Sequence, residues 1–297
     1  MNYLKKNAFE LTCLVAGLGL LAVPLHAQYT GPAAGQKVAF LGDSITNFGT
    51  GPGGYVALVA KALEQTGHKI EVIPAGVNGN TSNDMLARLD RDVLSKKPDW
   101  MTLSCGVNDV NRTDRGVPLE QYKQNITSIV DKATAAGIKV VILTATMIME
   151  DQSNAGNQKL VAYNDFLRSL ATEKHLLLAD LNADMQAALA QEKTKSPNLK
   201  GVVLTVDGIH MNGQGNEVMA AGMLKAFGFT DAQLAQAKES WLDLPDGMTL
   251  TLKPSMTVRQ YLQMREAATS QGHTVEEVLT EDLAKDVQNS VGATAKP

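Results

Sequence analysis

The chain has 297 residues, of which 44% are hydrophobic and 20% are charged, and its formal net charge is −4. This composition is ordinary for a globular protein that buries a substantial core, and the length favours one principal domain with an appendage. The slight acidic surplus argues against nucleic acid as a partner, because phosphate backbones are attracted by clustered basic residues.

Residues 1–27 differ from the rest of the chain. Lys5 and Lys6 precede an apolar run over residues 11–23, and Ala27 supplies a small residue at a cut site. This order predicts a secretory signal peptide and a secreted or periplasmic protein. An uncleaved membrane anchor is the alternative, but the run falls short of the roughly 20 residues that span a bilayer. We therefore expect no stable insertion in a membrane after the signal peptide is cleaved. We also expect the protein to be a monomer.

Residues 37 to about 228 alternate short apolar runs with longer amphipathic ones. The apolar runs cover residues 38–41, 70–73, 100–104, 140–143 and 176–179, and their continuous apolar character predicts strands covered on both faces. The amphipathic runs predict helices over residues 55–65, 83–95, 119–136, 158–174, 183–192 and 215–227. This α/β pattern predicts a three-layer α/β/α sandwich with a five-stranded parallel sheet.

Residues 231–297 have a different character and predict a mostly helical C-terminal extension to a principal domain over residues 28–230. Residues 231–241 look helical, and residues 248–252 suit a short strand. Capping boxes at Thr257-x-x-Gln260 and Thr274-x-x-Glu277 predict two later helices, and the chain from about residue 289 is expected to be loose.

Three segments that follow predicted strands carry candidate site residues, since ligands of an open parallel sheet bind at the carboxyl ends of its strands. Ser44 follows the first strand in Gly42-Asp43-Ser44, a glycine-rich loop over residues 74–82 follows the second, and Asn108 follows the third. Backbone N–H groups and an Asn amide suit an oxyanion hole. Ordinary turns, loops and helix caps are the alternatives for each segment.

A fourth segment, Asp207-Gly208-Ile209-His210, places an acid and a base three positions apart. A serine becomes a nucleophile when a histidine removes its proton, and a carboxylate orients that histidine. No pair of histidines has metal-ligand spacing, so we expect no zinc site. We expect no other metal and no cofactor.

These four segments together resemble the SGNH hydrolases, a subgroup of the GDSL esterases and lipases. Ser44, Gly79, Asn108 and His210 match the four blocks of that family in its order, over about 170 residues. The resemblance implies Ser44 as nucleophile, His210 as general base and Asp207 as its orienting acid. It implies an oxyanion hole formed by the backbone N–H groups of Ser44 and Gly79 and by the Asn108 amide.

Two positions depart from the family pattern. Asn80 stands where an Asp is usual, and Met211 stands where Pro commonly follows the histidine. Neither supplies a core catalytic group, so these departures bear on substrate fit.

The resemblance implies a carboxylic ester hydrolase that acts on a small-molecule or glycan ester through an acyl-enzyme. With 5% aromatic residues and no long exposed apolar run, we expect short-chain acyl groups, acetyl among them, on carbohydrates. We expect the segment over residues 144–157 to line the pocket. A lysophospholipase or thioesterase acting on lipids is the alternative within the family, and an inactive SGNH-like binding module is the non-enzyme alternative.

Overall fold

The computed structural model describes residues 29–198, 201–242, 244 and 256–294, and the chain divides into two compact units, Met1–Met248 and Thr249–Pro297. The predicted signal peptide and the strand predicted over residues 248–252 lie outside the described residues. Both therefore stay predictions.

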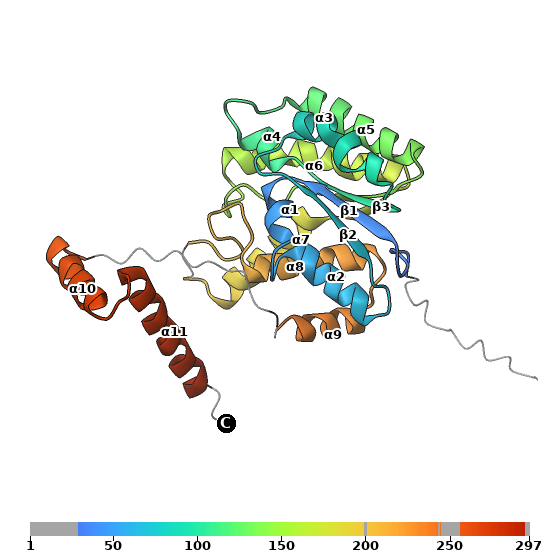
Figure 1. Cartoon of the computed structure of the whole chain (residues 1–297). Coiled ribbons are helices and arrows are strands. Elements are labelled where there is room, and N and C mark those ends of the chain that lie inside the picture. Colours follow the sequence, from blue (N-terminus) through green and yellow to red (C-terminus); the bar gives the residue numbers. More distant parts are fainter. Residues whose placement is uncertain (1–28, 199–200, 243, 245–255, 295–297) are drawn as a thin grey trace, which may run out of the picture. The chain divides into compact units, whose positions relative to one another are not determined.

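The described part of the first unit is built on one five-stranded parallel sheet (Figure 1). Its strands are β1 (Lys37–Gly42), β2 (Glu71–Gly76), β3 (Trp100–Ser104), β4 (Lys139–Leu143) and β5 (Leu177–Ala179), in the spatial order β2-β1-β3-β4-β5. Every residue of β3 is buried, and so are all those of β1 except Lys37, because helices cover both faces. The five apolar runs of the sequence thus correspond to the five strands, and the predicted parallel sheet is confirmed.

Helices flank the sheet on both faces and complete the three layers (Figure 1). One face carries α3 (Ser82–Asp92), α4 (Val107–Asn111), α5 (Leu119–Ala135) and α6 (Ala155–Glu173), where α3 packs on α5, and α5 and α4 pack on α6. The other carries α2 (Tyr55–Gln65), α7 (Leu181–Lys195) and α8 (Gly213–Ala226), with α8 packed on both α2 and α7. The sequence patterns located all of these helices except α4, which has only five residues.

The core lies between the sheet and these helices. α2 turns Tyr55 and Val59 inward with no exposed surface, and α5 does the same with Tyr122 and Ile126. Burying a side chain of this kind stabilises the fold by roughly 1.5 to 3 kcal/mol. The sheet is therefore a rigid base for the segments that leave its carboxyl edge.

A further helix, α9 (Asp231–Trp241), also belongs to the first unit. It packs on α2 and α8, and the Trp241 ring, which is 4% exposed, donates from Nε1 to the carbonyl of Leu58 at 3.1 Å. The sequence-based division at residue 230 assigned this helix to the extension. In the structure α9 belongs to the first unit, because it buries its apolar side against the principal domain.

The described part of the second unit contains α10 (Val258–Ser270) and α11 (Val275–Thr294). Thr257 and Gln260 form the predicted capping box, and Thr274 exchanges the corresponding bonds with Glu277. The helix α11 continues through the region predicted to be loose from about residue 289.

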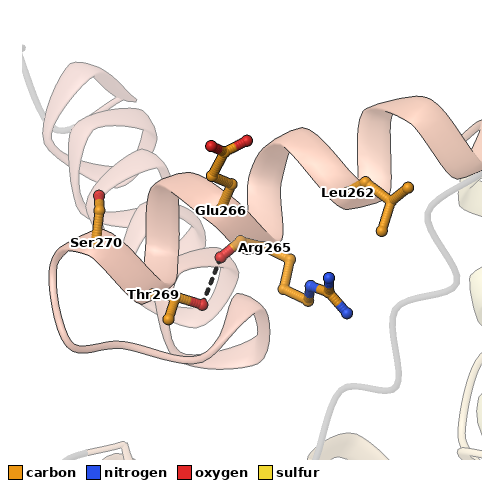
Figure 2. A pocket seen from close by; sticks show the side chains of 5 residues that line it. All are labelled: Leu262, Arg265, Glu266, Thr269 and Ser270. Carbon is orange, nitrogen blue, oxygen red and sulfur yellow. Dashed lines mark hydrogen bonds between the residues drawn. The ribbon is translucent and has the colours of Figure 1, made fainter.

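Side chains on one side of α10 line a hollow of about 630 Å³ (Figure 2). They are Leu262, Arg265, Glu266, Thr269 and Ser270. None of the predicted site residues lies on this unit. Among the described residues, no helix combines the length and the apolar character needed to cross a membrane.

Candidate active site

Ser44 begins a short helix directly after β1. Asp43 caps this helix, α1 (Ser44–Gly49), by accepting a hydrogen bond from the Ile45 N–H at 2.9 Å. Gly42 permits the sharp entry, because a Cβ at this position would lie 2.0 Å from the Thr46 hydroxyl oxygen. The turn predicted from Gly42-Asp43-Ser44 is therefore the start of a helix that holds Ser44 at the carboxyl edge of the sheet.

Asp207 and His210 lie on a tight hairpin whose sides are residues 203–206 and 210–212. The Val206 N–H donates to the carbonyl of His210 at 2.8 Å, and the Asn212 N–H donates to the carbonyl of Leu204 at 3.1 Å. The hairpin brings the acid and the base together, with Asp207 Oδ2 2.7 Å from His210 Nδ1. We call residues 203–212 the catalytic hairpin below.

The hairpin also brings His210 to Ser44, 166 positions earlier in the chain. His210 Nε2 lies 2.9 Å from Ser44 Oγ. A continuous hydrogen-bonded chain thus runs from the Asp207 carboxylate through the imidazole to the serine hydroxyl. This is the geometry required for a nucleophile, its base and an orienting acid.

The Asp207 carboxylate is held by its own loop. Partial burial acts to raise its pKa, but hydrogen bonds from the His210 N–H, the His210 ring and the Ile209 N–H outweigh burial, so the pKa is lowered. An ionised carboxylate only accepts hydrogen bonds, so Nδ1 of His210 carries the proton. Nε2 is then left to accept the proton of Ser44.

Asn108 lies in α4, at the end of β3, and faces the segment that holds Ser44. Its amide nitrogen donates to Asp43 Oδ2 at 3.2 Å and to the Asn80 carbonyl at 3.1 Å. Gly79, next to Asn80, has a left-handed φ of 72°, and its carbonyl accepts from Arg115 at 2.9 Å. The structure therefore gathers the segments of Ser44, Gly79 and Asn108, with Asn108 bridging the other two.

The side chain of Asn80 is hydrogen-bonded to a buried arginine. The buried Arg88 of α3 donates to Asn80 Oδ1 at 2.6 Å, to the Gly42 carbonyl at 2.9 Å and to Asp92 at 2.9 Å. Arg88 thereby ties the loop of Gly79 to the strand end before Ser44. No sequence pattern singles out Arg88, because an Arg on an amphipathic helix usually faces solvent.

Asp43 is a second residue whose role no sequence pattern indicates. It is 2% exposed, and burial raises the pKa of its carboxyl to about 6 although the Ile45 N–H and the nearby His210 act to lower it. A buried carboxylate this close to the nucleophile destabilises the native state once it ionises. Asp43 therefore makes stability depend on pH.

We expect the variant Asp43→Asn to gain stability over the wild type as pH rises. Folded Asp43 keeps its proton up to about pH 6, whereas the unfolded group titrates near 3.8, so only the wild type loses stability between these values. The difference in free energy of unfolding should grow by about 2.4 kcal/mol from pH 4 to pH 7. Urea titrations at both pH values measure it, and an equal difference at the two would contradict the role of Asp43.

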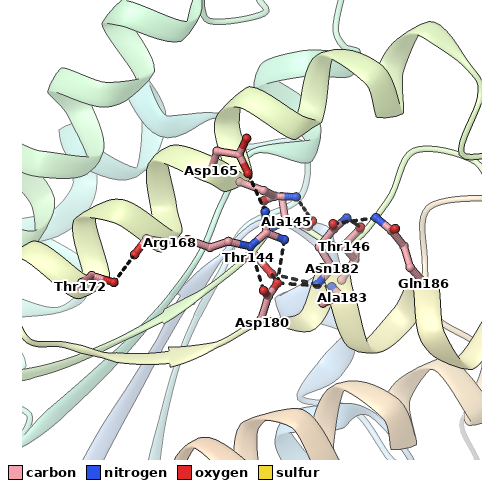
Figure 3. Close-up of polar contacts among 11 residues, drawn as sticks. Thr144, Ala145, Thr146, Asp165, Arg168, Thr172, Asp180, Asn182, Ala183 and Gln186 are labelled. Atoms are coloured by element: carbon pink, nitrogen blue, oxygen red, sulfur yellow. Dashed lines mark hydrogen bonds and ion pairs between the residues drawn. The ribbon is translucent and has the colours of Figure 1, made fainter.

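The segment over residues 144–157 begins in a polar network at the ends of β4 and β5 (Figure 3). Asp180 accepts from the Thr144 hydroxyl at 2.9 Å and from the guanidinium of Arg168 at 2.8 and 3.0 Å, and the Asn182 N–H donates to Thr144 at 2.8 Å. Residues 144–148 are buried, whereas Met149 is 49% exposed. Residues 151–156 are also at least partly exposed, and the expectation that this segment lines the substrate pocket stays a prediction.

The comparisons with known proteins agree with this geometry. The model of the GDSL-like lipase/acylhydrolase family matches residues 40–218, which include every residue of the hydrogen-bonded chain. The chain belongs to this family. It is accordingly a serine carboxylic ester hydrolase of the SGNH type.

Similar proteins include two kinds of esterase. An acetylxylan esterase from Geobacillus stearothermophilus is 28% identical over 216 residues, covering 66% of this chain and 95% of that protein. Esterase TesA from Pseudomonas aeruginosa is 37% identical over 128 residues, covering 42% of this chain and 60% of that protein.

Solved structures show the same likeness. The crystal structure of an acetyl xylan esterase named AlAXEase is 34% identical, covers 64% of this chain and 98% of that one, and has a TM-score of 0.60. A solved acetylxylan esterase from Geobacillus stearothermophilus is 27% identical over 67% of this chain and 96% of that one, with a TM-score of 0.59. Solved catalytic mutants of that esterase replace a serine, an aspartate or a histidine, the last two being three positions apart.

Proposed function

We propose that this chain is an exported serine esterase that removes short acyl groups, acetyl foremost, from carbohydrates through an acyl-enzyme on Ser44. The observation that carries the proposal is the hydrogen-bonded chain from Asp207 through His210 to Ser44, with distances of 2.7 and 2.9 Å.

In the first step Ser44 Oγ attacks the ester carbonyl while His210 Nε2 takes the serine proton. The C–O bond to the alcohol then breaks, and His210 returns the proton to the leaving oxygen. Water attacks the acyl-enzyme in the same way, so acid is released and Ser44 regains its proton. Asp207 stabilises the imidazolium in both steps without taking its proton.

The negative oxygen that develops in each step needs hydrogen-bond donors. The backbone N–H groups of Ser44 and Gly79 and the amide of Asn108 are the proposed donors, each contributing roughly 3 to 4 kcal/mol to the transition state. Both present acceptors of the Asn108 amide belong to protein, Asp43 and Asn80. One of those N–H groups turns to the oxyanion when substrate is bound.

Two observations support the proposal that the substrate is an ester of a carbohydrate. This chain covers nearly the whole length of the acetylxylan esterases, 95% to 98% of those chains. Phe48 stands beside the reactive pair, 53% exposed and with its ring 5.1 Å from that of His210. It offers a flat apolar surface of the kind that packs against a sugar ring or a short acyl group.

A lipid acyl hydrolase of the lysophospholipase or thioesterase type is the second candidate. The 37% identity to esterase TesA over 128 residues favours it. The two candidates differ in the acyl length that the site accepts.

We expect the ester with the shortest acyl chain to react best. Nitrophenyl esters from acetate to palmitate, measured with the purified mature protein, should show the highest kcat/KM for acetate and a steady fall with chain length. Acetate release from acetylated xylan would follow at the same active-site concentration. A preference for the long esters would contradict the carbohydrate proposal and favour the lipid candidate.

Export is proposed from the signal-like pattern of residues 1–27. Sequencing the N-terminus of the protein recovered from the periplasm or medium tests it. A mature chain that begins after Ala27 is expected, and retention of residues 1–27 would contradict the proposal.

A further inference from the structure

A buried carboxylate lies beneath the catalytic hairpin. Glu150 is 7% exposed, and its two oxygens accept four hydrogen bonds from three consecutive residues. Oε2 accepts from the Val203 N–H at 2.6 Å, and Oε1 accepts from the N–H groups of Leu204 and Thr205 at 2.7 and 2.9 Å and from the Thr205 hydroxyl at 2.7 Å. One side chain thus holds three consecutive residues on the first side of the hairpin.

Thr205 extends this hold to the tip of the hairpin. Its hydroxyl gives its proton to Glu150 Oε1, so its oxygen is oriented to accept the N–H of Gly208, at 3.0 Å. Gly208 lies between Asp207 and Ile209 and has a left-handed φ of 94°. The carboxylate of Glu150 is therefore connected, through one hydroxyl, to the turn that sets the spacing of Asp207 and His210.

Glu150 is itself fixed from the opposite side. The side chain of Asn157 accepts from the Ile148 N–H at 2.8 Å and donates to the carbonyls of Ile148 at 2.8 Å and Asp151 at 2.9 Å. Asn154 donates to the same two carbonyls at 2.6 and 2.7 Å. Two side chains at the start of α6 thus clamp the short segment that presents Glu150.

The clamped segment and the hairpin also fit together sterically. Met149 adopts a left-handed φ of 56°, a backbone conformation that residues other than glycine rarely adopt. A Cβ at Gly208 would lie 3.2 Å from Met149 Cα and 2.5 Å from its sulfur. Met149 therefore covers the turn that Thr205 holds from the other end.

We propose that Glu150 is the positioning residue of this active site, and that it fixes Asp207 and His210 through Thr205. The inference rests on the proposed function, in which those two residues act on Ser44. Glu150 touches neither substrate nor the reacting atoms. Its contribution is to keep the hairpin in the geometry that proton transfer needs, where a displacement of about 1 Å costs on the order of 100-fold in rate.

The test compares Glu150→Gln, Glu150→Ala, Thr205→Val and Thr205→Ser with the wild type. Gln keeps one oxygen for Leu204 and Thr205 but turns an NH₂ group toward the Val203 N–H, so kcat should fall about 10-fold, and about 100-fold for Ala. Val removes only the hydroxyl relay and should lower kcat about 10-fold, whereas Ser keeps the hydroxyl and should restore it. KM should change little in all four variants.

A second readout reports the positions of Asp207 and His210 without substrate. His210 Nδ1 lies 2.7 Å from Asp207 Oδ2, and the proton in this short hydrogen bond should give a far-downfield proton NMR signal in the folded wild type. We expect this signal to shift or broaden in Glu150→Gln and Thr205→Val and to stay in place in Thr205→Ser. The exposed Glu120, whose carboxylate pairs with Lys123 on α5, supplies the matched control Glu120→Gln, which should match the wild type in both readouts.

Unchanged kcat and an unchanged signal in Glu150→Gln and Thr205→Val would overturn the inference, and so would a rise in KM alone. If Glu150→Ala does not fold, the comparison of Thr205→Val with Thr205→Ser still tests the inference. A folded wild type without esterase activity would contradict the proposed function but not the inference about Glu150. The NMR comparison would then still test Glu150.

Discussion

Replacing Ser44 by alanine is expected to lower kcat for ester hydrolysis by about a million-fold, as when the nucleophile of other serine hydrolases is removed. Ser44 Oγ is the atom within 2.9 Å of His210 Nε2, so its loss leaves the base without a proton to take. The helix α1 should persist, because its cap is the Asp43 carboxylate and not the serine hydroxyl. Release of nitrophenol from the acetate ester measures the loss.

Ser128 supplies the control for this substitution. It lies on α5, and its exposed hydroxyl donates to the Gln124 carbonyl at 2.8 Å within the same helix. Ser128→Ala should keep wild-type kcat. Ser44→Ala with more than a hundredth of wild-type activity, in a preparation free of other esterases, would show that another group performs the attack.

Replacing Asp207 by asparagine is expected to lower kcat by about 10⁴-fold near neutral pH. Asn Oδ1 can still accept from the N–H groups of Ile209 and His210, so the turn should hold its shape. Its NH₂ group, however, would face His210 Nδ1 and force the ring proton onto Nε2. The imidazole would then be unable to accept the proton of Ser44.

The measurement is kcat over a range of pH for Asp207→Asn and for a matched exposed aspartate. Asp165→Asn on α6 removes the carboxylate that pairs with Arg168 at 2.9 Å and should leave kcat unchanged. An Asp207→Asn enzyme within about 10-fold of the wild type would contradict the orienting role of this carboxylate.

The strands and the order of the site segments could be predicted from sequence for a physical reason. Strands covered on both faces have nearly continuous apolar runs, and the carboxyl ends of parallel strands meet at one edge. Ser44, Asn108 and the loop of Gly79 were therefore expected together. The short helices α1 and α4 were not predicted, because five or six residues show no helical period.

The buried residues that hold the site segments in place could not be predicted from sequence patterns. Glu150 and Thr205 are 55 positions apart, and Arg88 and Gly42 are 46 apart, with no local motif at either residue. A charged residue in a loop or on an amphipathic helix is usually solvated. What marks these residues is burial together with several donors or acceptors around one group, and only the fold reveals that.

The most direct test of the central claim is to trap the acyl-enzyme. Wild-type protein mixed with nitrophenyl acetate and quenched in acid within its first turnovers, then digested and analysed by mass spectrometry, should carry one acetyl group on the peptide that contains Ser44. The Ser44→Ala variant should carry none. An active wild type without the acetylated peptide, or one acetylated at another residue, would contradict an acyl transfer through Ser44.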